Sequence, residues 1–533
     1  MERRTSFLRG AFVLTVAGFI VKILGAVYRI PLAMMIKDEG MGLYQMAYPI
    51  YVTLLSISTA GLPTAISKLV SSNVALKRYK NAFRIFKVSL TILGIIGFVS
   101  TAVLIIYAPY LSVNVLGNPK AYFPLISIAP AIFFVSIMSS FRGFFQGLQD
   151  MTPSAISQVV EQIGRVATVF LLASLLLPKG VEYAAAGAAF GPVVGAVLGL
   201  LVLIAVYYSK QKEIKVKISE DLEKRLDNPI KIFRDLLIFA VPITLGGLII
   251  PVMNLADAAI VPKRLQVAGF SITRATELYG QLTGMAAPLI NLPAIVTISL
   301  SASLVPAISE AMALNNIKLA SERAQLGVRI ALMFAIPAAV GLFILATPVS
   351  ILLYKNQEAG IPLSILAWGI IFLSLQQTTT GILQGVGKAA IPVYNLLLGA
   401  LSKIIANFIL TAIPAVNIRG AAFGTVLGYA VASLLNFAAA MRYSGMRLDF
   451  GKMIIRPGIS ALFMGAFVNY SFKLFLAKGV GQNLSTLFSI AIGVTIYILS
   501  LLLVGGIEES ELLALPFGER LARIVKKINI LRR

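Results

Sequence analysis

Long apolar stretches separated by short polar segments follow one another along the whole chain. A transmembrane helix needs about 20 consecutive, mostly apolar residues, and fourteen stretches reach that length. They lie at 10–35, 42–72, 86–108, 122–147, 154–177, 184–208, 233–256, 278–312, 325–348, 361–386, 392–414, 419–441, 453–476 and 484–505. The second and the eighth are long enough to tilt or kink in a bilayer. The pattern predicts an all-α polytopic membrane protein with about 14 transmembrane helices.

The composition agrees with a membrane protein. The chain of 533 residues is 58% hydrophobic and only 13% charged, whereas soluble domains carry about 25% charged residues. It contains no cysteine and no histidine, which excludes disulfides, thiol catalysis, Cys/His metal sites and histidine proton relays. We therefore expect no metal and no cofactor. The net charge of +24 fits the basic loops of a membrane protein, so we expect no nucleic-acid partner.

Basic residues concentrate in the loops on one side of the predicted spans. An even number of spans places both termini on that side. Its loops carry Lys77, Arg78, Lys80, Arg84, Lys87, the basic residues of 210–234, Arg442, Arg447, Lys452 and Arg456. The loops on the opposite side carry only scattered basic residues. The exception is the loop with Lys263, Arg264 and Arg274, which is basic although it lies on that opposite side. The positive-inside rule predicts that both termini lie on the cytoplasmic side of the cell membrane.

An internal repeat divides the chain into two similar halves. GAAFGPVVG at 187–195 returns as GAAFGTVLG at 420–428, identical at seven of nine positions. FQGLQDMTP is echoed by LQGVGKAAIP, and LPTAIS by LVPAIS, in the same order along the chain. Six spans precede the second copy, which indicates a parallel repeat about an axis along the membrane normal. We expect a six-helix lobe at 1–230, a second at 231–443, and two extra helices with a tail at 444–533.

Prolines interrupt the first two spans of each lobe, among them Pro31 and Pro63 in the first lobe and Pro251 and Pro306 in the second. Proline removes a backbone donor and allows a membrane helix to bend. These kinks serve either static packing or the bending of helices during alternating access.

The first span carries two basic residues inside its apolar run, Lys22 and Arg29. A charge within a span is costly unless it faces water or a partner. The two residues are seven apart, so in one continuous helix both project from the same face. Arg29 lies toward the far end and can also snorkel to the headgroups, an alternative that suits Lys22 poorly because it sits near mid-span.

The fifth span and its counterpart in the second lobe carry further charges. Glu161 and Arg165 are four residues apart on one helix and can neutralise one another. Lys403 holds nearly the same place in the second lobe as Arg165 does in the first, with Asn407 one turn later. No nucleophile–base pair, acidic metal cluster or phosphate-cradling loop stands out. We therefore expect no enzyme and no catalytic residue.

Asp257 ends the seventh span and can pair with Lys22 or Arg29 across the lobe interface. Together with these, Arg165, Glu161, Lys403 and Asn407 form the predicted lining of a central cavity. A lining with net positive charge selects anions and phosphates above all, whereas an exporter of cationic drugs needs unpaired carboxylates. The charge balance favours an anionic cargo.

The residues after Pro516 read FGERLARIVKKINILRR, with apolar residues at helical spacing and basic residues between them. This pattern predicts an amphipathic helix on the anionic cytoplasmic leaflet, in contact with membrane lipids. The alternative is an ordinary solvated tail.

Several motifs resemble a known family: KILGAVYRIPLA, GLYQMAYPIY, AGLPTAISKLVS and FFQGLQDMTP. They are similar to the polysaccharide biosynthesis proteins related to stage V sporulation protein B. More distantly they resemble the MurJ-type lipid II flippases of the multidrug/oligosaccharidyl-lipid/polysaccharide exporter (MOP) superfamily. The resemblance covers nearly the whole chain and is more specific for the superfamily than for the cargo.

The resemblance implies a flippase that moves a polyprenyl-pyrophosphate-linked cell-wall precursor through a cationic cavity by alternating access. Lys22 and Arg29 match basic residues of the first span in that family, Arg29 with a displacement of one residue. The last two helices, within 453–505, would form a groove for the polyprenyl tail. The family's arginines in the second and eighth spans are absent here, since the stretches around Leu55 and Ala287 are neutral. That departure points to the sporulation-protein branch.

Four functions remain open. The first is a flippase for a lipid-linked peptidoglycan precursor, lipid II, and the second is a flippase for another lipid-linked glycan. The third is a cation-coupled exporter of small molecules, and the fourth is a scaffold for synthesis enzymes. A proton or another monovalent cation, or the membrane potential alone, can drive transport. With no histidine in the chain, proton coupling would involve Asp257, Glu161 or another acid.

Overall fold

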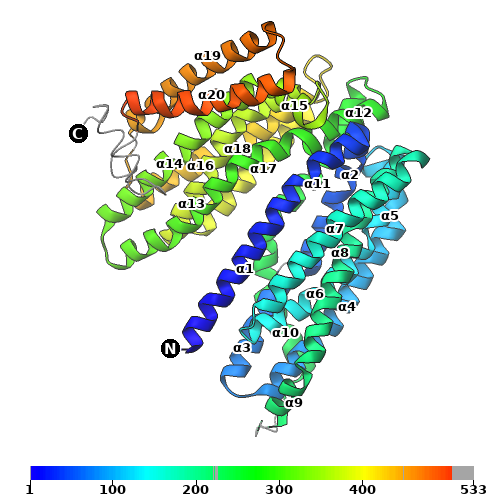
Figure 1. The fold of residues 1–533 in the computed structure, drawn as a ribbon. Coiled ribbons are helices and arrows are strands. Elements are labelled where there is room, and N and C mark those ends of the chain that lie inside the picture. The colour runs from blue at the N-terminus through cyan, green and yellow to red at the C-terminus, as the bar shows by residue number, and fades with distance from the viewer. Residues whose placement is uncertain (1, 60, 220, 222–225, 448, 507–533) are drawn as a thin grey trace. The chain divides into compact units, whose positions relative to one another are not determined.

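The computed structural model describes residues 2–59, 61–219, 221, 226–447 and 449–506, and within these ranges every regular element is a helix. The chain divides into two compact units, Met1–Gly280 and Gln281–Arg533. The predicted tail after Pro516 lies outside the described residues. Figure 1 shows the course of the helices within each unit.

The first unit is built from long helices joined by short connections. Its elements are α1 (Glu2–Val27), α2 (Arg29–Thr59), α3 (Leu62–Ala75), α4 (Tyr79–Tyr110), the π-helical turn η1 (Leu111–Val115), the 3₁₀ turn η2 (Pro119–Ala121), α5 (Tyr122–Ile128), α6 (Pro130–Gly147), α7 (Thr152–Leu176), the 3₁₀ turn η3 (Leu177–Lys179), α8 (Val181–Ser209), α9 (Gln211–Ser219), α10 (Pro229–Gly247), α11 (Ile249–Val267) and α12 (Ile272–Gly280).

The second unit has the same character. It comprises the π-helical turn η4 (Gln281–Ala286), α13 (Ala287–Ala313), α14 (Ile317–Ile344), α15 (Ala346–Tyr354), α16 (Gly360–Gly385), α17 (Ala390–Leu410), α18 (Ile418–Ser444), the π-helical turn η5 (Gly451–Ile455), α19 (Arg456–Ala477) and α20 (Gln482–Leu503).

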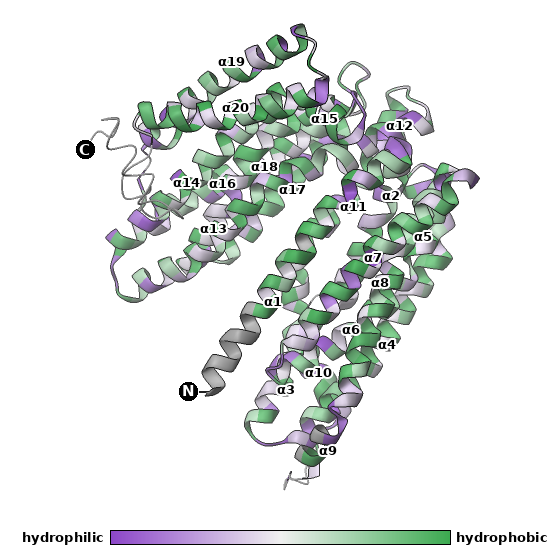
Figure 2. Cartoon of the chain, viewed as in Figure 1, coloured by the Kyte–Doolittle hydropathy of each residue, from purple (hydrophilic) through white to green (hydrophobic). Residues whose placement is uncertain are grey.

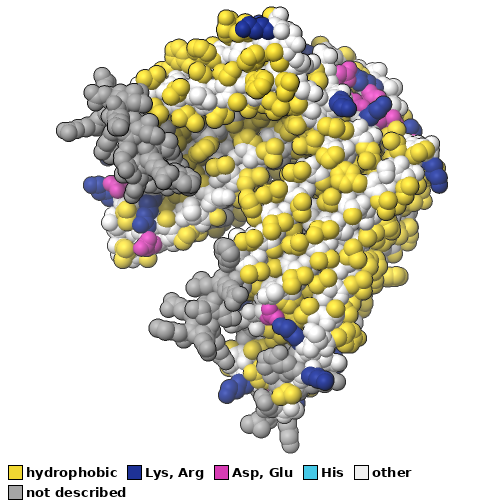
Figure 3. All heavy atoms as spheres, viewed as in Figure 1, with side chains coloured by type: hydrophobic (Ala, Val, Ile, Leu, Met, Phe, Trp, Pro, Cys, Tyr) yellow, Lys and Arg dark blue, Asp and Glu magenta, His cyan; other side chains and the backbone are white. Residues whose placement is uncertain are grey.

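The protein is a multi-pass membrane protein. Twelve helical segments among the described residues are long and apolar enough to cross a membrane, or thirteen if the bent pair α10–α11 counts as one span. Hydrophobic residues cover most of the length of these helices, and hydrophilic ones gather toward their ends (Figure 2). On the face seen in Figure 3, Lys, Arg, Asp and Glu side chains likewise gather near helix ends, and hydrophobic side chains cover the flanks between them.

Two helices break at the same position relative to a proline. α1 ends at Val27, four residues before Pro31, and α10 ends at Gly247, four residues before Pro251. Proline has no N–H for the carbonyl four residues earlier, and its ring collides with that carbonyl. α10 and α11 are bent by 47° at this break. The predicted span at 10–35 therefore contains a helix boundary at Tyr28, inside the helical segment Val13–Ala75.

Other predicted spans also divide into shorter elements. The stretch at 42–72 is shared between α2 and α3, and α2 has a further kink at Lys37, where φ is 57°. The stretch at 233–256 is shared between α10 and α11, and that at 278–312 begins in α12 and continues through η4 into α13. The apolar length of a stretch is therefore a poor guide to where its helix ends, because prolines and turns lie within it.

Helices α10, α11 and α12 follow residue 228 in the sequence and belong to the first unit. Ile232 and Leu236 of α10 lie in the hydrophobic core that α3, α4, α6 and α8 build. Near the other end of the unit, Asn118 Nδ2 donates a hydrogen bond to Thr276 Oγ1 of α12 at 2.8 Å. The lobe boundary at 230, which the repeat indicates, stays a prediction.

The repeated glycine motif forms a tight helix pair in each unit. In the first unit α8 packs on α7, and a Cβ atom placed on Gly195 would lie 3.1 Å from the Cβ of Arg165. In the second unit α18 packs on α17, and a Cβ atom on Gly428 would lie 2.9 Å from the Cβ of Lys403. Arg165 and Lys403 therefore hold corresponding positions in two similar helix pairs.

Candidate functional site

A cluster of three charged side chains lies between α6 and α7 of the first unit. Glu161 Oε1 accepts a hydrogen bond from Arg165 Nη2, and its Oε2 accepts one from Arg142 Nη2, both at 2.9 Å. Arg142 Nε also donates to Ser157 Oγ at 3.0 Å. The three charged side chains are only 14–17% exposed. Because one carboxylate faces two guanidinium groups, the cluster carries a net positive charge.

The structure confirms the predicted pair of Glu161 and Arg165 and adds a second partner for the carboxylate. Glu161 also pairs with Arg142, which lies on α6. Arg142 was not among the charged residues named from the sequence within the spans. The signal was present, because Arg142 falls inside the predicted span at 122–147. Arg329 was missed in the same way within 325–348. It is buried, and its Nη2 donates to the carbonyl of Gly506 at 3.0 Å in the second unit.

Tyrosines of α2 surround Arg29 of the same helix. The rings of Tyr44 and Tyr48 stack with centroids 5.7 Å apart, because residues four apart share a helix face. The hydroxyl groups of Tyr28 and Tyr44 lie 3.2 Å apart at hydrogen-bond distance. Tyr48 is half-buried and interacts electrostatically with both Arg29 and Arg165. These phenols link the two arginines into one polar region.

Three buried N–H donors in this region lack a hydrogen-bond partner among the described residues: Arg29 Nε, Gln162 Nε2 and Arg165 Nε. A buried donor without a partner costs about 1–3 kcal/mol, and such groups in a native protein call for an explanation such as a bound ion or water. Two of the three are guanidinium donors, which favour phosphate or carboxylate oxygens. The arrangement is suited to an anion.

Lys22 and Arg29 lie on different helices, α1 and α2, since the chain breaks at Tyr28. α1 packs on α7, and a Cβ atom on Gly25 would lie 3.6 Å from Gln162 Nε2. The side chain of Lys22 lies outside the described residues, so its predicted role in the cavity stays a prediction. Arg29 begins α2, directly after the C-terminal end of α1. Gln162 of α7 lies beside Gly25, near the same end of α1.

The other predicted site residues are buried but lie elsewhere. Asp257 is 8% exposed on α11, which packs on α2 in the first unit, and its pairing with Lys22 or Arg29 stays a prediction. Lys403 and Asn407 are buried on α17 of the second unit. On the same helix, Asn395 Nδ2 donates to Asn436 Oδ1 of α18 at 2.8 Å, so uncharged polar groups extend along this helix pair.

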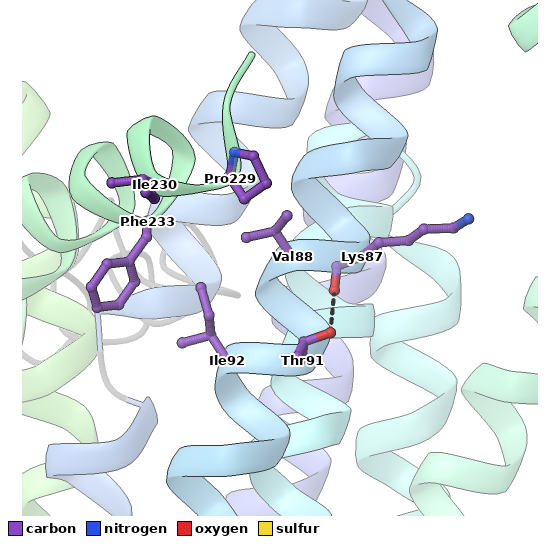
Figure 4. A pocket seen from close by; sticks show the side chains of 7 residues that line it. All are labelled: Lys87, Val88, Thr91, Ile92, Pro229, Ile230 and Phe233. Carbon is purple, nitrogen blue, oxygen red and sulfur yellow. Dashed lines mark hydrogen bonds between the residues drawn. The ribbon is translucent and has the colours of Figure 1, made fainter. Parts of the chain in front are cut away.

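A pocket of about 510 Å³ opens between α4 and the start of α10. Its lining consists of Lys87, Val88, Thr91, Ile92, Pro229, Ile230 and Phe233. Thr91 Oγ1 donates to the Lys87 carbonyl at 3.1 Å, and Figure 4 shows the Lys87 ammonium pointing away from Ile230 and Phe233. This pocket therefore presents hydrocarbon, and it suits an acyl chain better than a charged headgroup.

A second pocket, of about 490 Å³, lies between α14 and α19 of the second unit. Its lining consists of Val340, Phe343, Ile344, Leu462, Gly465, Ala466 and Asn469. Asn469 is its one polar side chain. The pocket adjoins α19, within the stretch 453–505 where the sequence predicts a groove for a polyprenyl tail.

Comparison with known proteins adds the family. The profile of the family described as "Polysaccharide biosynthesis protein" matches residues 7–312, and the MatE profile matches residues 283–409. Stage V sporulation protein B of Bacillus subtilis (strain 168) is 31% identical over 97% of this chain and 99% of its own length. Lipid II flippase MurJ of the same organism is 30% identical over 88% of each chain.

Solved structures share the fold at low sequence identity. The structure described as "Lipid II flippase MurJ, inward closed conformation" aligns with a TM-score of 0.68 at 16% identity, covering 92% of this chain and 98% of that one. An inward-facing multidrug resistance MATE family transporter of the MOP superfamily gives 0.64 at 15% identity, covering 82% and 98%. The lipid II flippase of Bacillus subtilis is a transporter, as are the proteins in both solved structures, which confirms a transporter family and not one of enzymes. The chain belongs to the polysaccharide biosynthesis protein family.

Proposed function

We propose that the protein is a flippase for a polyprenyl-pyrophosphate-linked cell-wall precursor, with lipid II as the first candidate. The precursor would cross the bacterial cytoplasmic membrane by alternating access, with its headgroup in a cationic cavity. The observation that carries this proposal is the pair of buried guanidinium N–H groups of Arg29 and Arg165, beside a charge cluster with a positive surplus. Pyrophosphate offers the oxygens and the negative charge that this arrangement lacks.

The proposed cavity includes Lys22, Arg29, Glu161, Arg165 and Asp257 together with Lys403 and Asn407. We propose fourteen crossings with both termini in the cytoplasm. The 63-residue helical segment Val13–Ala75 supports that number, since one crossing takes about 20 residues. The pocket beside α19 supports a tail groove in the second unit. The names of two relatives, a sporulation protein and a lipid II flippase, support a cell-wall or spore-wall cargo.

A flippase for another lipid-linked polysaccharide unit shares every one of these features. A cation-coupled exporter of small molecules is favoured by one separate observation, the MatE match over residues 283–409. The two classes differ in the charge of the cargo. A site with surplus guanidinium groups repels a cationic dye and attracts a phosphate, so the charge cluster supports the flippase.

The test is complementation of a flippase-depleted strain by Lys22→Ala and Arg29→Ala variants of the full chain. We expect either variant to abolish growth while reaching the membrane at the wild-type level. Dye efflux from vesicles provides the second measurement. Wild-type complementation by both variants, or robust efflux of small cationic dyes, would contradict the proposal.

A further inference from the structure

The two arginines on Glu161 are held in unequal ways. Arg142 donates to Glu161 through Nη2 and to Ser157 Oγ through Nε, and Ser157 Oγ in turn donates to the Ser154 carbonyl at 2.9 Å. Arg142 is therefore fixed against α7 by two hydrogen bonds. Among the described residues Arg165 donates a hydrogen bond to Glu161 Oε1, and its Nε is buried without a partner. Arg165 is the member of the cluster that can accept another anion.

An anion that binds Arg165 competes with a carboxylate already present there. A phosphate group carries more acceptor oxygens than Glu161 can offer with one oxygen, and it can bridge both guanidinium N–H groups in the bidentate manner. The displaced carboxylate must keep a partner, since a buried charge without one is strongly unfavourable. Arg142 already holds its second oxygen, so Glu161 can release Arg165 without becoming unpaired.

We propose that Glu161 is the resident counter-anion of Arg165, which the pyrophosphate of the lipid-linked substrate displaces, and that Arg142 is the positioning residue that keeps the displaced carboxylate paired. This inference rests on the proposed function. It also gives Glu161 a part in release, because its return to Arg165 expels the bound phosphate. Glu161 thus weakens binding and speeds turnover.

The test uses four forms of the full chain in lipid nanodiscs: wild type, E161Q, R142Q and the double variant R142Q/E161Q. The ligands are inorganic pyrophosphate and undecaprenyl pyrophosphate, measured by calorimetry or thermophoresis. We expect E161Q to bind both about tenfold more tightly, because the competing charge is gone. R142Q is expected to bind about tenfold more weakly, because Glu161 then pairs with Arg165 alone. The double variant should bind at least as tightly as the wild type.

E310Q serves as the matched control, since Glu310 pairs with Arg323 at 2.9 Å on the surface of the second unit. It should bind like the wild type. Gel filtration and thermal unfolding check that each variant folds, and R142K replaces R142Q if the latter does not. If Glu161 had only a structural role, E161Q would bind the ligands more weakly than the wild type. Tighter binding by E161Q therefore distinguishes the counter-anion role from a structural one.

Weaker or unchanged binding by E161Q, or a double variant no better than R142Q, would overturn the inference and leave the proposed function standing. No binding of either ligand by the wild type would instead overturn the proposed function. Tight binding of inorganic pyrophosphate without any gain for the lipid form would assign the site to free pyrophosphate, and would also overturn the inference as stated.

Discussion

Pro31 and Pro251 hold the same position in two broken helices. Each is the third residue of its helix, α2 or α11, and the preceding helix ends four residues earlier. The repeat places the two breaks in the first span of each predicted lobe. α10 and α11 are bent by 47° at their break, whereas α1 and α2 belong to one helical segment, Val13–Ala75. Both breaks follow from the missing proline N–H.

Replacing these prolines tests whether the breaks bend during transport. In Pro31→Ala or Pro251→Ala a backbone N–H returns, and a continuous helix becomes favourable by up to ~3 kcal/mol. We expect slower transport with unchanged membrane insertion. Pro337→Ala is the control, since Pro337 lies within the continuous helix α14. Transport at the wild-type rate in both variants would assign the breaks to static packing, as the sequence allowed.

The close approach of α8 to α7 is a second test. A Cβ atom on Gly195 would lie 2.5 Å from the Glu161 carbonyl and 3.1 Å from the Arg165 Cβ. We expect Gly195→Ala to separate the helices, lower stability by about 1–3 kcal/mol and displace Arg165. Gly94→Ala is the matched control, because a Cβ there meets no atom within 4 Å. Equal unfolding temperatures for the two variants would rule out the tight contact.

If the pocket beside α19 binds the polyprenyl tail, filling it should impair binding of the tail and leave binding of the pyrophosphate headgroup unchanged. Ala466 is exposed in this pocket, so Ala466→Trp fills it without disturbing the core. We expect transport of the lipid-linked substrate to need a several-fold higher concentration, with binding of inorganic pyrophosphate unchanged. Ala491→Trp, at an exposed position of α20, should behave like the wild type. Unchanged transport in Ala466→Trp would exclude this groove as the tail site.

Acid should weaken the attachment of the segment that precedes α10. Asp227 accepts hydrogen bonds from Lys231 Nζ at 2.8 Å and from Asn81 Nδ2 at 2.6 Å. Its bond to Lys231 is the main reason that the pKa of Asp227 lies below its ordinary 3.8. A lowered carboxyl pKa adds stability above 3.8, and this stability is lost as the pH falls below it through the folded value.

The measurement is the thermal unfolding temperature at about pH 5 and at about pH 3. At the higher pH, Asp227→Asn should unfold at a lower temperature than the wild type. At the lower pH, the unfolding temperatures of the two proteins should lie closer together. The effect will be modest because Lys231, the ion-pair partner of Asp227, is 53% exposed and solvent screens the pair. The same decrement at both pH values would show that the charge of Asp227 adds nothing.

Hydropathy predicted the helical class and the multi-pass membrane character, because apolar length can be counted in the sequence. The internal repeat predicted the correspondence of Arg165 with Lys403. Hydropathy did not predict where helices break, although Pro31 and Pro251 carry that signal. The partnership of Arg142 with Glu161 joins two helices, and no spacing within one helix indicates such a contact. The tyrosines around Arg29 were read as part of a family motif and not as neighbours of a charge.

The most direct measurement of the central claim is the appearance of lipid II in the outer leaflet of cells depleted of other flippases. Cells that express the wild-type chain should expose lipid II, and cells that express Arg29→Ala or Arg165→Gln at the same membrane level should not. No outer-leaflet lipid II with the wild type, or undiminished exposure with both variants, would contradict the assignment of a lipid II flippase with a cationic site.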